Sequence, residues 1–100
     1  MAVVVLTATS NLPASAAELT NYGSFDCGKW FTSEPAKFWL LGFLSGANFG
    51  RSAGRKNYDP LAKVKSTEKI YLWMDNYCKE NPLETVNNGA SALFIEIEYK

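Results

Sequence analysis

Apolar residues recur at helical spacing between residues 66 and 81. They form one stripe at positions i, i+3, i+4, i+7 and i+8, made of Ile70, Trp73, Met74, Tyr77 and Cys78. Ser66 precedes this stripe as a candidate N-cap, and Asn81-Pro82 follows it. A residue before proline is disfavoured in the helical conformation, so the stripe should end there. The pattern predicts a helix over residues 66–80.

The pair Asn81-Pro82 can also begin a helix. Asn81 would be the N-cap, Pro82 the first helical residue and Glu84 the acidic residue of a capping box. A second apolar stripe follows, made of Leu83, Val86, Ala90, Leu93, Phe94 and Ile97. We therefore predict another helix over residues 82–95, with Asn81 and Pro82 as a structural corner. Polar and apolar residues alternate over 96–100, which leaves a short strand or a helix end as alternatives for the tail.

The most apolar segment covers residues 35–50, after a candidate cap at Ser33, and it predicts a third helix. Because it is apolar nearly all round, it must be buried on several sides or present a face to a partner. Its aromatic residues form the candidate surface for a client or partner: Phe38, Trp39, Phe43 and Phe49. Glycines recur every fourth residue, at Gly42, Gly46 and Gly50. We expect them to let another helix of the domain pack closely.

A short helix near residues 25–31, capped by Ser24, would place Cys27, Trp30 and Phe31 on one face. Cys27 and Cys78 are the only cysteines and lie 51 positions apart, and the chain has no histidine. The residues alone leave two alternatives, a disulfide in an oxidising compartment or two buried reduced thiols. A bridge closing a loop of this length stabilises a fold by about 4 kcal/mol in the chain-entropy model.

The first seventeen residues predict a signal peptide. Residues 2–8 are almost entirely apolar, residues 14–17 are small, and all twenty charged residues lie at or after Glu18. A β-strand over residues 2–7 is the alternative. The remaining residues, 18–100, then form a single domain of a size that usually gains from a covalent bond between distant segments. No segment has the ~20 consecutive apolar residues that a spanning helix needs, so no membrane insertion is predicted.

Charges are segregated along a chain of zero net charge, which has ten basic and ten acidic residues. Residues 51–69 are basic and residues 75–100 are acidic. Residues 50–60 predict a loop, and only Tyr58 interleaves with the cations of the basic segment, so no nucleic-acid partner is expected. Its Gly54-Arg55-Lys56-Asn57 run lacks the Lys-Ser/Thr pair of a phosphate-binding loop.

Residues for catalysis or metal binding are missing. Without histidine, Ser-His and Cys-His mechanisms lose their base and most metal sites lose a ligand. Asp75, Glu80 and Glu84 lie off the apolar stripes and are expected in solvent. The sequence therefore predicts no catalytic residue, no metal and no cofactor, and a binding or structural protein instead of an enzyme.

Two short motifs resemble the HdeA/HdeB family of small periplasmic acid-stress chaperones. They are Asp26-Cys27-Gly28-Lys29-Trp30-Phe31 before the aromatic helix and Tyr77-Cys78-Lys79-Glu80-Asn81-Pro82 before the last helix. The resemblance covers residues 24–94. It implies an all-α fold of three main helices and a short N-terminal one, closed by a Cys27–Cys78 disulfide in the periplasm.

The resemblance also implies a function. In acid, the neutralised carboxyl groups would leave a charge of about +10, so the bundle should loosen and expose the aromatic surface to client proteins. The Gly-rich helix and the Asn-Pro corner also resemble periplasmic immunity proteins that neutralise type VI secretion effectors, which makes one specific protein partner the alternative. A homodimer is compatible with either function.

Overall fold

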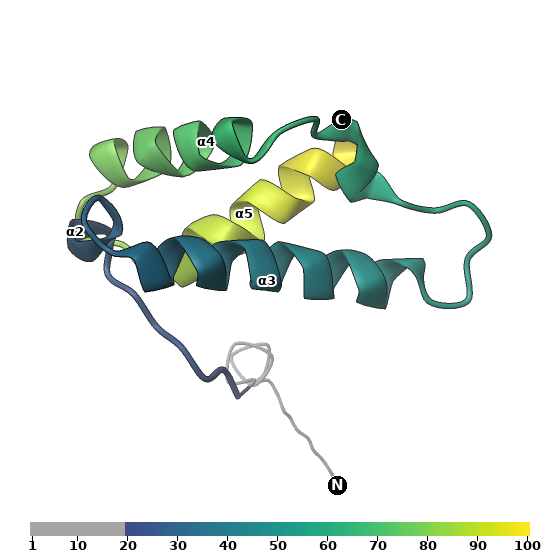
Figure 1. Ribbon diagram of the computed structural model, residues 1–100, viewed down its shortest axis with the longest axis horizontal. Helices are drawn as coiled ribbons and strands as arrows, with labels where there is room; N and C mark the ends of the chain where they lie inside the picture. Colours follow the sequence, from purple (N-terminus) through teal and green to yellow (C-terminus); the bar gives the residue numbers. More distant parts are fainter. Residues whose placement is uncertain (1–19) are drawn as a thin grey trace, which may run out of the picture.

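A computed structural model describes residues 20–100 as a bundle of α-helices with one 3₁₀ helix, and it contains no strand within that range. The elements are α2 (Cys27–Trp30), α3 (Glu34–Ser52), η2 (Pro60–Lys63), α4 (Thr67–Glu80) and α5 (Val86–Tyr99). Helix α5 packs against both α3 and α4, α2 contacts α3 and α4 at one end of the bundle, and η2 contacts α3 and α5 (Figure 1). The all-α prediction is confirmed. The predicted signal peptide at residues 1–17 lies outside the described residues.

Serine side chains begin the two longest predicted helices. Ser33 Oγ accepts a hydrogen bond from the N–H of Ala36, 3.1 Å away, at the start of α3. Ser66 Oγ accepts one from Lys69, 3.4 Å away, at the start of α4. Helix α4 agrees with its prediction, and α3 is longer than expected at both ends. In the short α2 the N-cap position is Asp26 instead of Ser24, and the Asp26 side chain makes no capping hydrogen bond.

Asn81 ends α4 without beginning the next helix, so the predicted helix start at Pro82 is wrong. The backbone N–H of Asn81 donates to Tyr77 O at 2.9 Å, and its side-chain amide donates to the same carbonyl at 3.0 Å. The N–H of Glu84 then donates to Asn81 O at 3.0 Å, which closes a turn. Leu83 lies in this turn and is fully exposed, so it does not belong to the core.

Pairing with the N-terminal segment holds the chain extended before α5. The N–H of Cys27 donates to Glu84 O at 3.0 Å, and the N–H of Val86 donates to Phe25 O at 2.7 Å. These bonds flank a single antiparallel bridge. Thr85 supplies the N-cap of α5, which then continues to Tyr99, so the C-terminal tail is a helix end. This long-range pairing is the physical reason for the late helix start.

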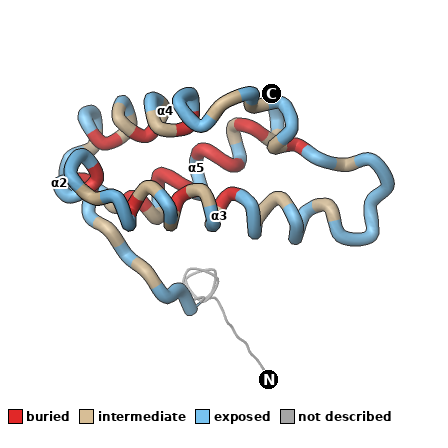
Figure 2. The backbone as a smooth tube through the Cα atoms, viewed as in Figure 1, coloured by how far each residue is buried: buried red, intermediate tan, exposed pale blue. Residues whose placement is uncertain are grey.

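The core lies where the helices face one another, and the Cys27–Cys78 disulfide closes it at the α2 end. The two sulfur atoms are 2.05 Å apart and the Cα atoms 5.0 Å apart. Trp30 is fully buried beside the bond, whereas Phe31, expected on the same face, is exposed. Figure 2 shows the buried positions on the inner sides of α3, α4 and α5. They include Ala36, Leu40, Leu44, Ile70, Met74, Val86, Ala90, Leu93, Phe94 and Ile97.

Gly89 allows α5 to approach α4 closely. A Cβ atom at this position would lie 2.8 Å from Met74 Sδ and 2.8 Å from the ring of Tyr77. Contacts that short do not occur in folded proteins, so only glycine fits here without a rearrangement of α4. The Tyr77 ring itself stacks on Trp73 at 5.4 Å between centroids.

Candidate protein-binding surface

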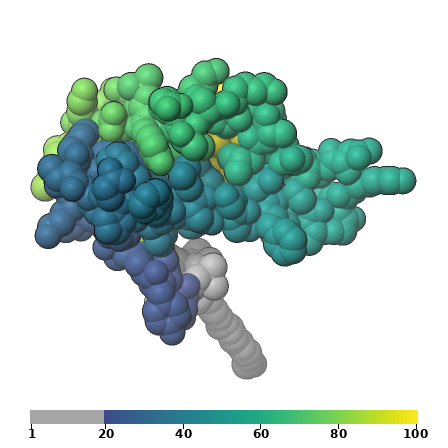
Figure 3. Space-filling model, in the orientation of Figure 1, coloured from purple at the N-terminus to yellow at the C-terminus, as the bar shows by residue number. Residues whose placement is uncertain are grey.

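One side of the bundle is formed by two long stretches of α3 and α5 that contain no charged residue. Residues 38–50 of α3 and 85–95 at the start of α5 contain no Asp, Glu, Lys or Arg. The exposed members of these stretches form what we call the uncharged face: Phe38, Gly42, Ser45, Gly46, Phe49, Gly50, Asn88, Ser91, Ala92 and Ile95. Helix α3 runs along the lower front of the space-filling view, below α4 (Figure 3).

Phe38 and Phe49 are the largest exposed groups on this face. Their exposed fractions are 67% and 78%. They are eleven positions apart, about three helical turns, so both rings project from the same side of α3. Large aromatic rings that are exposed together on one side of a helix are typical of a contact surface.

Trp39 and Phe43, the other two residues of the predicted surface, are partly buried. Their rings stack on each other at 5.3 Å between centroids with an interplanar angle of 28°. Trp39 also contacts the ring of Phe25 at 6.2 Å. The structure therefore brings all four predicted aromatic residues onto one helix but presents only Phe38 and Phe49 to solvent in the folded state.

The N-terminal segment covers Trp39. Gly23 lies so close to the indole that a Cβ atom there would be 2.6 Å from Trp39 Nε1, and its φ of 139° is readily adopted only by glycine. Asn87 holds the segment in place, because its Oδ1 accepts from Phe25 N at 3.1 Å and its Nδ2 donates to Gly23 O at 2.7 Å. Sequence reasoning missed Asn87, since nothing in its neighbourhood marks a helical asparagine as a clamp.

The glycine series of α3 faces outward, so the expected close packing against another helix of the domain is wrong. No atom of a neighbouring element in the described chain lies within 4 Å of a Cβ built at Gly42, Gly46 or Gly50. The spacing of four residues places these glycines in one row on the helix, as predicted. Core contacts on the opposite side of α3 turn that row toward solvent.

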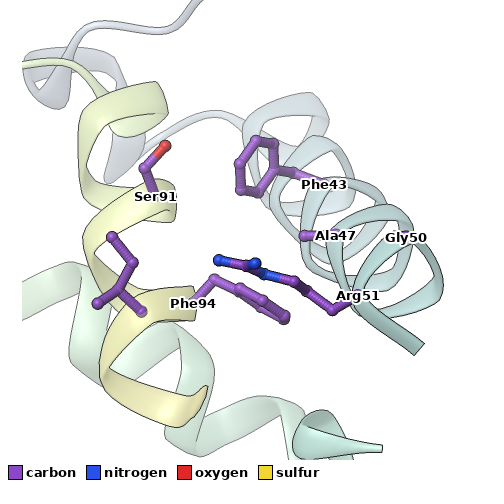
Figure 4. Close-up of a pocket in the computed structure, with 7 residues that line it drawn as sticks. Phe43, Ala47, Gly50, Arg51, Ser91 and Phe94 are labelled. Carbon is purple, nitrogen blue, oxygen red and sulfur yellow. The ribbon is translucent and has the colours of Figure 1, made fainter. Parts of the chain in front are cut away.

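A shallow groove separates α3 from α5 along the edge of the uncharged face (Figure 4). It has a volume of about 410 Å³ and is lined by Phe43, Ala47, Gly50, Arg51, Ser91, Phe94 and Ile95. The Arg51 side chain reaches from α3 toward α5 at one end of the groove. Apart from Arg51 and Ser91, the walls offer only apolar side chains and backbone.

A buried carboxylate lies beyond the Arg51 end of this groove. The Glu98 side chain is 3% exposed, and its Oε2 is 3.1 Å from Arg51 Nε and accepts from the Tyr58 hydroxyl at 2.8 Å. Its Oε1 is buried without a hydrogen-bond partner among the described residues. Lys63 Nζ donates to Ile97 O at 2.8 Å beside it. These contacts fasten the basic loop to the end of α5. The hydrogen bond to Glu98 is also the main reason that the pKa of Tyr58 is raised.

A second carboxylate joins α2 to α4. Asp75 Oδ1 accepts a hydrogen bond from Trp30 Nε1 at 2.7 Å, so the expectation that Asp75 is simply solvated is wrong. Lys37 Nζ lies over the face of the indole, 4.5 Å from the ring centroid, and donates to Trp30 O at 3.2 Å. The cation and the carboxylate together fix Trp30 beside the disulfide.

The described residues offer no cluster of three potential metal ligands, and no helix among them is long and apolar enough to cross a membrane. No protein-family model, curated protein or solved structure matches the chain. The groove, the uncharged face and the two carboxylates are therefore the features from which a function can be argued.

Proposed function

We propose that this protein is a small exported binding protein that holds unfolding proteins in acid, as HdeA/HdeB-like chaperones do. The uncharged face carries the proposal, because Phe38 and Phe49 offer apolar surface to any unfolding chain without a charge that selects among clients. The disulfide supports export to the periplasm, since such bonds persist in oxidising compartments.

Acid acts on this surface through two carboxylates. Neutralising Glu98 weakens the contacts of its carboxylate with Arg51 and Tyr58, so the basic loop is held less firmly to α5 at this end of the groove. Protonation of Asp75 weakens the bond that holds Trp30 against α4. The growing positive charge of the whole chain adds repulsion. The groove would then expose more of Phe43, while the disulfide keeps the ends of α2 and α4 together.

A specific protein partner is the second candidate. Phe38 and Phe49 are already exposed in the folded bundle, so a partner could bind this face without any loosening. A fixed, largely rigid surface of this kind suits an immunity or inhibitor protein, which must bind one effector under ordinary conditions.

Acid protection of an aggregation-prone client decides between the two. We expect the oxidised protein to suppress light scattering of the client at about pH 2–3, and we expect a Phe38→Ser/Phe49→Ser variant to lose most of that effect. Leu72→Ser is the matched control, because Leu72 is 59% exposed on α4, away from the uncharged face. If protection is absent in acid, and a stoichiometric partner co-purifies at neutral pH and is lost in the Phe38→Ser/Phe49→Ser variant, the second candidate is the function.

A further inference from the structure

We infer that the folded protein adsorbs to the surface of an anionic phospholipid bilayer through the end of α3 and the loop that follows it. We call this region the loop end and define it by Phe49, Ala53, Arg55 and Lys56. The contact is peripheral: the cations meet the lipid phosphates, and the phenyl ring enters the interface beside them. The inference concerns neutral pH, and it stands whether or not the protein binds clients in acid.

The first argument is the sign of the charges at this end of the bundle. Between Glu34 and Asp59 the sequence contains four basic residues and no acidic one. Residues 51–69 and the end of α5 beside them, 96–100, together carry seven basic and four acidic side chains, a net charge of +3. An anionic bilayer attracts such a surface, and each cation close to it raises the binding constant about fivefold.

The loop presents Arg55 and Lys56 at its tip, at the end of the molecule opposite α2 (Figure 1). Gly54 and Asn57 flank the pair with positive φ values of 76° and 60°, which turn the chain back toward the bundle. Arg55 Cζ lies over the Tyr58 ring, 4.7 Å from its centroid. Both cations are exposed, and neither forms an ion pair within the described chain. They are therefore available to an anionic surface.

An exposed apolar side chain lies next to these cations. Phe49 occupies the last turn of α3 and is 78% exposed, and its carbonyl accepts a hydrogen bond from the N–H of Ala53 at 3.1 Å where the loop begins. Ala53 is exposed as well. A phenyl ring beside cations is the composition of surfaces that bind at a bilayer interface, because the ring can leave water while the cations stay at the phosphates. A soluble polyanion would satisfy only the cations.

The disulfide end of the molecule carries the opposite charge. Residues 20–37 and 75–85, which include α2 and the end of α4, contain five acidic and three basic side chains, a net charge of −2. The difference between the two ends gives the molecule a dipole along the bundle. A negative surface should therefore attract the protein with its loop end forward and its disulfide end away from the lipid.

Co-sedimentation of the oxidised full chain with lipid vesicles at pH 7 tests the inference. We expect vesicles with about one third phosphatidylglycerol to bind the protein about tenfold more tightly than pure phosphatidylcholine vesicles, and we expect about 0.5 M salt to abolish the difference. Arg55→Glu/Lys56→Glu should weaken the binding by about tenfold or more. Lys29→Glu/Lys79→Glu makes the same change in net charge at the disulfide end and should weaken it far less. Circular dichroism shows whether each variant remains folded. An absence of binding to the anionic vesicles, or an equal loss in the two double variants, overturns the inference.

Phe49→Ser distinguishes a bilayer from other polyanions. This variant should weaken binding to the anionic vesicles several-fold and should leave binding to soluble polyphosphate unchanged, because polyphosphate has no apolar interior. Leu72→Ser removes an apolar side chain that is 59% exposed on α4 and should change neither measurement. If Phe49→Ser binds the vesicles as tightly as the unmodified protein, the loop end is a general anion site and the bilayer is overturned as its partner.

Discussion

The indole Nε1 of Trp30 lies 2.7 Å from Oδ1 of Asp75, which makes this the side-chain hydrogen bond that ties α2 to α4 beside the disulfide. Trp30 is fully buried, so its N–H has no access to water. The bond spans 45 positions of sequence and therefore contributes to the tertiary fold and not to any one helix.

Replacement of Trp30 by Phe should lower the free energy of unfolding by about 1–3 kcal/mol, because the variant leaves the Asp75 carboxylate without its donor and a small gap beside the disulfide. Urea unfolding at pH 7 measures the change. Trp73→Phe is the control, because no hydrogen bond from the Trp73 indole is present in the described structure. This variant should lower the free energy of unfolding by less than Trp30→Phe does. Equal losses in the two variants would contradict a specific role for the Trp30–Asp75 bond.

Removal of the disulfide should destabilise the bundle by about 4 kcal/mol, because the unfolded chain regains the freedom of a long loop. The measurement is urea unfolding of the oxidised protein with and without a reducing agent. A Cys27→Ser/Cys78→Ser variant should match the reduced protein and should not respond to the reductant. Unfolding midpoints that do not differ between oxidised and reduced protein would refute this prediction.

Two glycine substitutions should act in opposite directions. Gly89→Ala places a methyl group against Met74 and Tyr77 and should cost about 1–3 kcal/mol. Gly46→Ala meets open space on the exposed side of α3 and should stabilise the helix by up to about 1 kcal/mol. Thermal unfolding at low protein concentration, where any dimer is dissociated, compares them. The same sign of change in both variants would be inconsistent with the described packing of α4 and α5.

The pKa of Tyr58 is raised, first by its hydrogen bond to Glu98, because the neutral phenol is the form that donates. Its contribution to stability is therefore fully present below the ordinary tyrosine pKa of about 10 and is lost as the pH rises through the raised value. Tyrosinate absorbance should show a late-ionising group that disappears in Tyr58→Phe. The pKa of Tyr77 is also raised, by burial, and Tyr77 should remain as a second late group.

Glu98→Gln isolates the cause of the Tyr58 shift. The amide keeps an acceptor but loses the negative charge, so the pKa of Tyr58 should move back toward its ordinary value. Tyr22→Phe removes a fully exposed phenol and should leave the late ionisation unchanged. A late Tyr58 ionisation that persists in Glu98→Gln would show that the negative charge of Glu98 is not its cause.

Acid should expose apolar surface in a cooperative step. With no histidine, we expect little change in dye binding from pH 8 to 5 and a rise between about pH 4 and 2, where carboxylates lose their charge. Glu98→Gln imitates the protonated carboxyl group and should shift the rise to higher pH. A dye signal and tryptophan spectrum that stay constant down to pH 2 would exclude acid loosening.

The helices could be predicted because their signals are local. The apolar stripe of α4 and the serine caps of α3 and α4 follow from residues within one or two turns. The cysteine pairing followed from the resemblance and is confirmed. The start of α5 could not be predicted, because it depends on hydrogen bonds between residues 84–86 and Phe25 and Cys27, which lie about sixty positions earlier.

The candidate site could be predicted only in part, because periodicity gives a row of residues but not the direction in which the row points. Of the four aromatic residues, Phe38 and Phe49 are exposed, yet Trp39 is covered by a segment that lies sixteen positions earlier. Gly89 has no glycine neighbour at helical spacing and so gave no signal. Glu98 lies in the C-terminal tail, where polar and apolar residues alternate. Its burial depends on Arg51 and Tyr58, which are distant in the sequence.

The clamp made by Asn87 sets the order in which the chain can fold. The hydrogen bonds that Asn87 makes to Gly23 and Phe25 can form only when Asn87, more than sixty positions later in the chain, is available. Helix α3 can form earlier from its own residues, but Trp39 then stays uncovered for as long as the C-terminal part is missing. A chain that lacks its C-terminal part therefore passes through a stage in which α3 has neither α5 on its inner side nor the N-terminal segment held over its tryptophan.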